Sequence, residues 1–218
     1  MNAADPAAPQ TRRLVVISGG LRQPSSTRLL ADRLTEAVVR GLGDAGLPVE
    51  VSVVELREHA RDLTSMLLTG FATPALQTAL DAVGAADGLV LVTPIYSGSY
   101  TGMVKDLADL LPDGAIAGVP VLMGATAGTA RHSLALEHAV RPLLSHLRAA
   151  VVPTGVFAAT EDFGEVDGST TADTHPLAVR VERGARELVA QMASRPPRGA
   201  APDPFALTST FEDLIAGM

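Results

Sequence analysis

The sequence predicts an α/β protein: a three-layer sandwich in which helices cover both faces of a five-stranded parallel sheet with strand order 2-1-3-4-5. Short apolar runs rich in β-branched residues alternate with longer segments of helical period, which is typical of a parallel sheet buried on both faces. Loops rich in glycine, serine and threonine follow the first, third and fourth apolar runs. In an open parallel sheet such loops lie at the carboxyl ends of the strands, where ligands bind.

The predicted strands and helices alternate along the chain. Apolar β-branched runs predict five strands, at residues 14–18, 49–55, 88–93, 120–124 and 149–154. Apolar residues three and four apart predict five helices, at residues 27–42, 73–83, 101–111, 131–147 and 176–192. Proline marks several of their turns: Pro74 has a first-turn position, Pro112 follows the third helix, and Pro142 should kink the fourth.

Three segments lie outside this alternation. Residues 56–71 are apolar without strand periodicity, so they form either a short helix or loop at an interface or a plain core connection. Residues 1–12 are expected to be a flexible tail ahead of one domain at 13–194. Residues 195–218 are expected to form a Pro-rich linker and a short amphipathic segment, 205–215. This segment and residues 56–71 are the candidate contacts of an oligomer.

Composition argues against several classes of protein. The chain of 218 residues has no cysteine, which excludes disulfide scaffolds, thiol catalysis and cysteine-ligated metal sites. Its net charge of -7 argues against a nucleic-acid binder. It has neither a signal-peptide core nor an apolar stretch long enough to cross a membrane, so we expect a cytoplasmic protein without membrane or nucleic-acid partners.

The loop after the first predicted strand suits a phosphate group. It reads Ser18-Gly-Gly-Leu-Arg22-Gln-Pro-Ser25-Ser26-Thr27, and it leads into a helix whose free amides and positive dipole end favour an anion. The three hydroxyls at its end can donate to phosphate oxygens, and the Arg22 guanidinium offers a planar pair of donors. An ordinary helix cap is the structural alternative. Neither G-x-G-x-x-G nor a P-loop Gly-Lys-Ser/Thr is present, which argues against a tightly held dinucleotide and a nucleotide triphosphatase.

The loop after the third predicted strand suits a flat ring. It reads Pro94-Ile95-Tyr96-Ser97-Gly98-Ser-Tyr100-Thr-Gly102 and holds both tyrosines of the chain. Its glycines allow close approach of the backbone, and its amides and serine hydroxyls can bond the polar edge of a ring. Either Tyr96 or Tyr100 can pack on the ring face. A strand-to-helix turn with a buried tyrosine is the alternative.

A third loop, Gly124-Ala-Thr126-Ala-Gly128-Thr129, follows the fourth predicted strand. Its amides would face the pyrimidine side of a flavin, where reduction places negative charge. Arg131 just beyond would stabilise that charge, meet the phosphate of a nicotinamide nucleotide, or make only a surface ion pair. Together the three loops suggest bound flavin mononucleotide (FMN) and redox chemistry.

Other chemistries have little support in the sequence. The five histidines lack metal-ligand spacing and no H-E-x-x-H occurs, so no metal site is expected. The absence of G-x-S-x-G argues against a serine hydrolase.

With these loops identified, the chain resembles the NADPH-dependent FMN reductase family of flavodoxin-like proteins, in particular the flavin reductases that supply two-component monooxygenases. The resemblance covers residues 14–190. It is carried by Ser18-Gly-Gly-Leu-Arg22 with Ser25-Ser-Thr27, by Thr93-Pro-Ile-Tyr-Ser-Gly-Ser-Tyr-Thr-Gly-Met-Val-Lys105, and by Ala125-Thr-Ala-Gly-Thr129 with His132. It implies an NAD(P)H:FMN oxidoreductase that is a homodimer or homotetramer, passes hydride from NADPH or NADH to flavin N5, and has a flavin-dependent monooxygenase as partner.

The resemblance also implies the site residues. Cofactor binding is expected from Ser18, Arg22, Ser25, Ser26, Thr27, Pro94, Ile95, Tyr96, Ser97, Gly98, Thr126, Gly128 and Thr129, and nicotinamide nucleotide contacts from Tyr100 and Arg131. The first loop reads Ser-Gly-Gly-Leu-Arg where many relatives have Gly-Ser-x-Arg, an extra residue that leaves the phosphate ligands open. No side chain is expected to act as acid or base, because the flavin itself accepts the hydride.

Alternative functions stay open at this point. One is an enzyme that keeps FMN fixed and reduces a quinone, an azo dye or a metal oxyanion. Others are a flavodoxin-type electron carrier and a flavin-free structural relative. The sequence does not discriminate NADPH from NADH, or FMN as prosthetic group from FMN as substrate.

Overall fold

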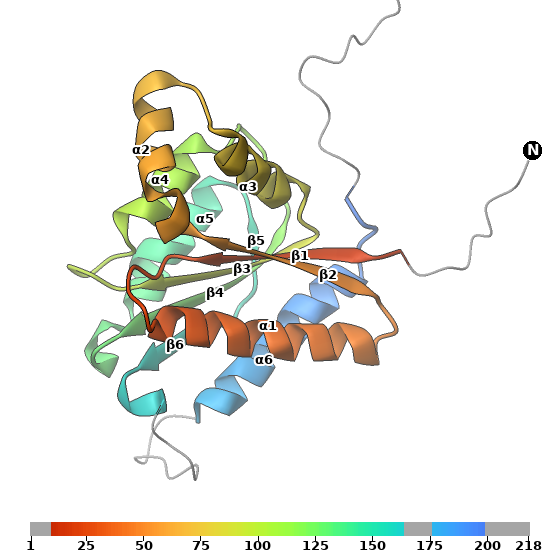
Figure 1. Ribbon diagram of the computed structural model, residues 1–218. Coiled ribbons are helices and arrows are strands. Elements are labelled where there is room, and N and C mark those ends of the chain that lie inside the picture. The colour runs from red at the N-terminus through yellow and green to blue at the C-terminus, as the bar shows by residue number, and fades with distance from the viewer. Residues whose placement is uncertain (1–9, 164–175, 199–218) are drawn as a thin grey trace, which may run out of the picture.

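The computed structural model describes residues 10–163 and 176–198, and Figure 1 shows their arrangement in three layers. Helices α1 and α6 pack together on one face of the sheet, and α2, α3, α4 and α5 cover the opposite face. The elements in chain order are β1 (Arg12–Ser18), α1 (Ser26–Asp44), β2 (Val49–Glu55), η1 (Leu56–His59), α2 (Ala60–Thr69), α3 (Pro74–Ala85), β3 (Gly88–Pro94), α4 (Gly102–Leu110), β4 (Pro120–Ala127), η2 (Ala130–His132), η3 (Leu136–Val140), α5 (Arg141–His146), β5 (Ala150–Val151), β6 (Val156–Ala159), η4 (Glu161–Phe163) and α6 (Leu177–Ala193).

The sheet confirms the predicted fold class. All strand pairs are parallel and the order is β2-β1-β3-β4-β5, the flavodoxin-like order. The single last strand expected at 149–154 is wrong: β5 and β6 both pair with β4. Pro153 lies between them and has no N–H to donate, so the chain leaves the ladder there and returns at Val156.

Two apolar layers sandwich the sheet because successive side chains of a strand point to opposite faces. In β1, Val15 and Ile17 join the core cluster beneath α3 and α4, whereas Leu14 and Val16 join the cluster beneath α1 and α6. Every residue of β3 is buried. The central strands are therefore rigid supports for the loops at their carboxyl ends.

The predicted continuous helix at 131–147 is wrong. This stretch consists of a 3-10 turn (η2), a π-helical turn (η3) and the short helix α5. The Arg141 N–H bonds the carbonyl of Leu136, five residues back. Pro142 follows directly, and its ring crowds the carbonyl four residues before it, so a wider turn replaces the α-helical one.

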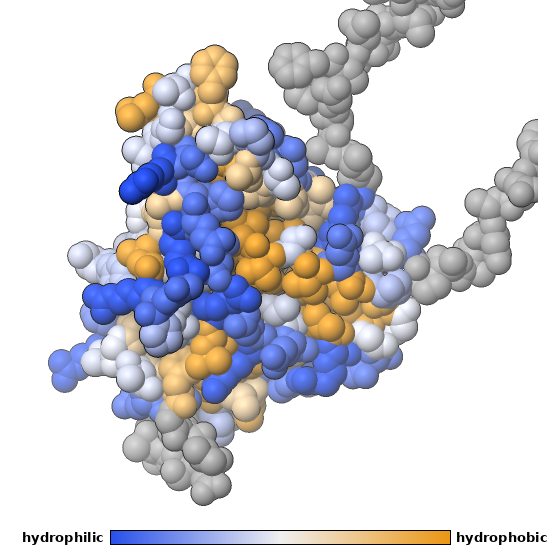
Figure 2. All heavy atoms as spheres, in the orientation of Figure 1, coloured by the Kyte–Doolittle hydropathy of each residue, from blue (hydrophilic) through white to orange (hydrophobic). Residues whose placement is uncertain are grey.

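Residues 56–69 are helical, in η1 and α2, and Gly70 ends α2 in the left-handed conformation; a short helix was one of the readings of this segment. Helix α2 packs on α4, yet Leu68 and Phe71 at its far end are 82% and 81% exposed. Figure 2 shows a few apolar side chains among hydrophilic ones at the upper left, over α2. Large apolar side chains this exposed at one end of a helix are candidates for contact with a partner.

The first residues of the predicted linker pack against the amino ends of the strands. The Arg198 N–H donates to Asp87, which also accepts from the Arg13 N–H at 2.7 Å, and Arg12 Nη2 donates to the Arg195 carbonyl at 2.8 Å. The segment 205–215 lies outside the described residues, and the division into a domain at 13–194 and two tails stays a prediction. Over residues 10–163 and 176–198, no helix is long and apolar enough to cross a bilayer.

Candidate functional site

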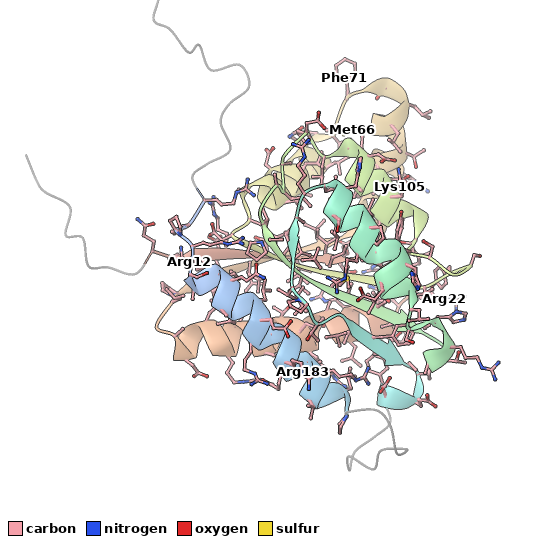
Figure 3. All side chains as sticks on the ribbon, turned by 180° about the vertical axis from the view of Figure 1, so that it is seen from behind. Arg12, Arg22, Met66, Phe71, Lys105 and Arg183 are labelled. Atoms are coloured by element: carbon pink, nitrogen blue, oxygen red, sulfur yellow. The ribbon has the colours of Figure 1, made fainter. Side chains whose placement is uncertain are left out.

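The structure brings the three predicted loops together at one edge of the sheet. Register places Ser18, at the end of β1, beside Val92 of β3, and Pro94, at the end of β3, beside Thr126 of β4. Because these strands are parallel and adjacent, their loops emerge side by side. Arg22 projects from this edge (Figure 3).

Thr126 connects all three loops. Its hydroxyl lies 2.8 Å from the Thr27 hydroxyl at the start of α1, and both side chains are buried. Its carbonyl accepts the Ile95 N–H at 2.8 Å. Thr126 therefore links the third loop to the first through its side chain and to the second through its backbone.

The Thr27–Thr126 hydrogen bond gives a testable prediction. Thr126→Val should lower the free energy of unfolding by about 1–3 kcal/mol, because it leaves the buried Thr27 hydroxyl without a partner. The double variant Thr27→Val with Thr126→Val removes both hydroxyls and should recover part of this loss, as measured by denaturant unfolding of both single variants and the double. A double variant that merely adds the two single losses would contradict the coupling.

The first loop presents free donors. Ser25 caps α1 by accepting the Arg28 N–H at 3.2 Å. In the part of the chain that the structure describes, the N–H groups of residues 20–23 and 25–27 have no hydrogen-bond acceptor. The side chains of Arg22 and Ser26 are exposed and likewise unpaired within the described ranges, whereas Ser18 is buried.

Glycine is required at the two positions that shape this loop. A Cβ on Gly20 would lie 2.4 Å from Ser25 Oγ, and one on Gly19 would lie 2.9 Å from Val104 Cγ2. The loop therefore curls closely around the cap of α1. Amides, hydroxyls and one unpaired guanidinium are the donor set that a phosphate monoester requires.

The second loop is a tight turn that exposes one tyrosine. Tyr96 and Ser99 exchange two backbone hydrogen bonds of 2.9 and 3.1 Å around Ser97 and Gly98, whose φ angles are 51° and 81°. Positive φ at both central positions is typical of a type I′ turn. Ser97 and Gly98 are exposed, Pro94 and Ile95 are buried beneath them, and Tyr96 is 43% exposed.

Tyr100 and Arg131, the two expected nicotinamide nucleotide contacts, differ in exposure. Tyr100 is partly buried against the core cluster, so Tyr96 is the more accessible of the two rings. Arg131 is exposed in η2, beyond the exposed Gly128 and Thr129, and makes no ion pair with any described residue. Arg131 is thus available to an anionic ligand.

A hydroxyl beneath the loops has no partner. Thr101 precedes α4 and is only 4% exposed, and its Oγ makes no hydrogen bond within the described ranges. It lies 3.4 Å from the position of a Cβ on Gly19. The Thr101 hydroxyl is thus an additional hydrogen-bonding group of the site, beneath the first loop.

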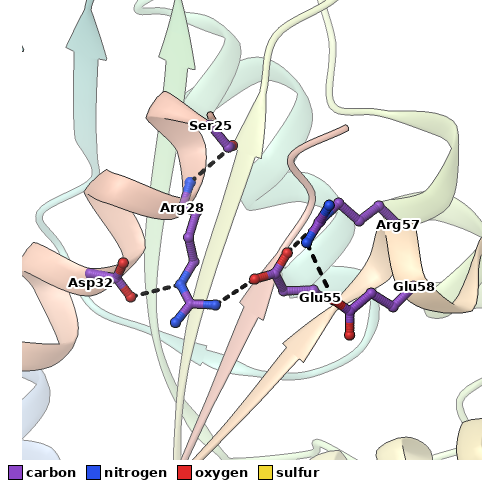
Figure 4. Close-up of polar contacts among 6 residues, drawn as sticks. All are labelled: Ser25, Arg28, Asp32, Glu55, Arg57 and Glu58. Carbon is purple, nitrogen blue, oxygen red and sulfur yellow. Dashed lines mark hydrogen bonds and ion pairs between the residues drawn. The ribbon is translucent and has the colours of Figure 1, made fainter. Parts of the chain in front are cut away.

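Sequence reasoning missed a charged network beside the first loop (Figure 4). Glu55, the last residue of β2, accepts hydrogen bonds from Arg28 and Arg57. Register places Glu55 beside Ser18, so β2 contributes to the same edge. A charged residue at the carboxyl end of the second predicted strand was the available indication.

The network predicts a pH dependence of stability. The hydrogen bond from Arg57, with that from Arg28, lowers the pKa of Glu55 below its ordinary 4.5, against partial burial, which raises it. A depressed folded-state pKa means that the stabilisation is complete above the unfolded pKa and is lost as pH falls through the folded one. The difference in unfolding free energy between wild type and Glu55→Gln should therefore be constant above about pH 5 and shrink at lower pH. Denaturant unfolding of both proteins at several pH values above and below pH 5 measures this difference. A difference that grows as the pH falls would contradict the prediction.

Chemically, this edge can hold an anion at the first loop and a planar ring at the other two. Within the described ranges, no three His, Asp or Glu side chains come together in a way that could hold a metal ion. The residues at the three loops thus fit FMN: a phosphate at the amides of the first loop, and a ring beside Tyr96 and Thr126.

Comparisons with known proteins agree with this geometry. The sequence profile of the NADPH-dependent FMN reductase family matches residues 12–164. The chain is 41% identical over 151 residues to the FMN reductase (NADPH) of Pseudomonas aeruginosa, covering 69% of this chain and 78% of that protein. It is 39% identical over 176 residues to the NADH-dependent FMN reductase SfnE of Pseudomonas putida, covering 81% and 90%. The crystal structure of an oxidoreductase from Corynebacterium diphtheriae is similar with a TM-score of 0.79 at 45% identity, covering 85% of this chain and 99% of that one.

Proposed function

Because the chain belongs to the NADPH-dependent FMN reductase family, we propose that it transfers a hydride from a nicotinamide nucleotide to N5 of FMN held by the three loops. As a member of this family it is an oxidoreductase that uses NAD(P)H and FMN. The observation that carries the proposal is the position of Thr126, which joins a loop of free donors to the loops that suit a ring.

Each loop has a separate role in this proposal. The side chains of Arg22 and Ser26, with the amides of residues 25–27, would hold the phosphate, while the Ser25 and Thr27 hydroxyls shape the start of α1 through Arg28 and Thr126. Residues 94–98 would line the isoalloxazine, with Thr126, Gly128 and Thr129 on its pyrimidine edge. When bound, FMN supplies the hydride-accepting chemistry itself. The chain therefore needs to bind and orient its ligands, and no side chain has to move a proton.

Two exposed residues would guide the nicotinamide nucleotide. Tyr96 is 43% exposed; it would lie beside the ring and leave one face for the nicotinamide to stack on. Arg131 carries an exposed positive charge that would meet a phosphate of the nucleotide.

Steady-state kinetics on gel-filtered protein test the proposal. NADPH and NADH oxidation should depend on FMN, with riboflavin as the comparison that lacks the phosphate. Protein that neither binds FMN nor oxidises either nucleotide in its presence would contradict the proposal. Turnover with a quinone but not with free flavin would favour an enzyme with fixed FMN, and FMN binding without nucleotide oxidation would favour an electron carrier.

The proposal includes release of reduced FMN to a flavin-dependent monooxygenase, in the cytoplasm. The partly exposed Tyr96 and the absence of tryptophan from the chain support an open ring site, which favours release over storage of electrons. Under anaerobic conditions with excess NADPH, reduced FMN should appear in an ultrafiltrate that excludes the protein. Reduced flavin retained entirely with the protein would contradict this part.

We also propose a homodimer or homotetramer in which α2 contributes to the contact. Phe71 lies at the tip of the molecule, close to the end of α2 that carries Met66 (Figure 3), and Leu68 is almost fully exposed nearby. Leu68→Asp combined with Phe71→Asp should lower the molar mass in solution measured by light scattering. Val179→Asp, at an exposed apolar position on α6, is the matched control. A truncation after Arg195 tests the segment 205–215, and an unchanged number of subunits per oligomer would remove it from the proposal.

A further inference from the structure

We propose that Glu55 is a positioning residue for FMN: through Arg28 and Arg57 it holds the helical end and the middle of the first loop in the shape that receives the phosphate. The inference rests on the proposed function. It assigns a role in ligand affinity to a residue of β2, a strand that carries none of the predicted ligands.

Glu55 is placed to brace this loop. It ends β2 in register with Ser18, the residue from which the loop departs. Its side chain is only 17% exposed, and its two oxygens have different partners (Figure 4). Oε1 accepts from Arg28 Nη1, and Oε2 accepts from Arg57 Nε at 2.6 Å.

Arg28 fastens the helical flank of the loop. Its backbone N–H donates to Ser25 Oγ, which makes the cap of α1. Its side chain bonds Glu55 and, through Nε at 2.7 Å, Asp32 one turn further along α1. The first turn of α1 is thus attached to the end of β2 at the point where the loop ends.

Arg57 fastens the middle of the loop. In the amide orientation that matches donors to acceptors, Gln23 Oε1 accepts from Arg57 Nη1 at 2.8 Å and also from Nη2. Arg57 Nη2 also donates to the exposed Glu58 at 3.2 Å. Gln23 lies within the loop, next to Arg22, so Glu55 reaches the loop at Gln23 and at its helical end through two guanidinium groups.

This bracing leaves the proposed phosphate donors unoccupied. Arg22 and Ser26 have no side-chain partner in the described part of the chain, although their neighbours Gln23 and Ser25 are both hydrogen-bonded. A loop already held at two points loses less conformational entropy when it closes on a ligand. Glu55 should therefore favour phosphate binding without touching the phosphate.

The alternative is that removing the Glu55 charge strengthens FMN binding. Glu55 neutralises positive charge near the phosphate position, and its removal would leave Arg28 and Arg57 with a smaller opposing charge. If electrostatic attraction outweighed loop order, Glu55→Gln would tighten FMN binding. The direction of the change therefore decides between positioning and charge compensation.

Binding of oxidised flavin to the full-length protein, followed by flavin fluorescence, tests the inference without turnover. Glu55→Gln should raise the Kd for FMN about tenfold and that for riboflavin less than about twofold. Glu58→Gln is the matched control, because it removes a carboxylate from the same Arg57 and should leave both Kd values within about twofold. Glu55→Asp keeps the charge and should recover part of the FMN affinity.

The remaining outcomes are distinguishable. Wild-type protein that does not prefer FMN to riboflavin would contradict the proposed phosphate site itself. If the wild type prefers FMN and Glu55→Gln binds it equally or more tightly, or loses both flavins equally, only the role of Glu55 is overturned. Should Glu55→Gln fail to fold, Gln23→Ala at an exposed position removes the Arg57 arm alone. A rise in the FMN Kd of about threefold without change for riboflavin would support the inference, and no rise would overturn it.

Discussion

Arg22→Ala is expected to raise the Kd for FMN by about 10- to 100-fold and to change that for riboflavin by less than about twofold. Arg22 is exposed, carries the one guanidinium within the first loop and has no partner among the described residues. Hydrogen bonds from an arginine to phosphate are charge-assisted and are among the stronger ones in proteins. Riboflavin lacks the phosphate, so the ratio of the two losses isolates this contact.

The control for Arg22→Ala is Arg61→Ala, which removes an exposed arginine from α2 and so changes net charge equally. It should leave both affinities unchanged, because long-range charge effects are screened by salt. Flavin fluorescence titration at constant ionic strength measures all four constants. Equal losses of FMN and riboflavin in Arg22→Ala would show that Arg22 is not a phosphate ligand.

Leu34→Ala is expected to lower the free energy of unfolding by about 2–5 kcal/mol, the range for truncating a buried leucine. Leu34 has no exposed surface and lies in the middle of α1. A Cβ on Gly124 of β4 would lie 3.2 Å from Leu34 Cδ1, so helix and strand are already in contact there. Truncation leaves a cavity that this packed layer can fill only partly.

Leu29→Ala on the same helix is the control. Leu29 is 43% exposed, so the same chemical change should lower stability by less than about 1 kcal/mol. Urea unfolding of the flavin-free proteins measures both, and similar losses at the two positions would contradict the packing argument. Saturating FMN should raise the unfolding midpoint of Leu34→Ala, because a ligand of the folded state stabilises it by mass action.

The fold and the position of the three loops were predictable because both follow from local sequence patterns. Alternating β-branched and helical segments identify strands and crossovers, and the carboxyl ends of parallel strands meet at one edge. Arg22, Tyr96 and Thr126 were assigned to one site on that ground. The structure brings their loops together, and their roles toward FMN stay proposals for the titrations above.

Two backbone features were not predictable, since they depend on the structure that surrounds a proline. Pro153 interrupts the last strand, and Pro142 accompanies a π-helical turn where a simple kink was expected. Composition indicates that a proline disturbs its element. It does not indicate whether the chain bends, widens or splits there, because that depends on the hydrogen bonds that the neighbouring strand or turn can still offer.

By itself the sequence determined the layered α/β architecture, the edge at which the three loops meet and the residue types available there, because periodicity and strand order follow from local patterning. Only the tertiary structure decided which side chains meet at that edge. The Thr27–Thr126 bond and the Glu55 network join positions distant in the chain. Their contacts depend on strand register and on the distance between packed layers, which arise only when the whole sheet has formed.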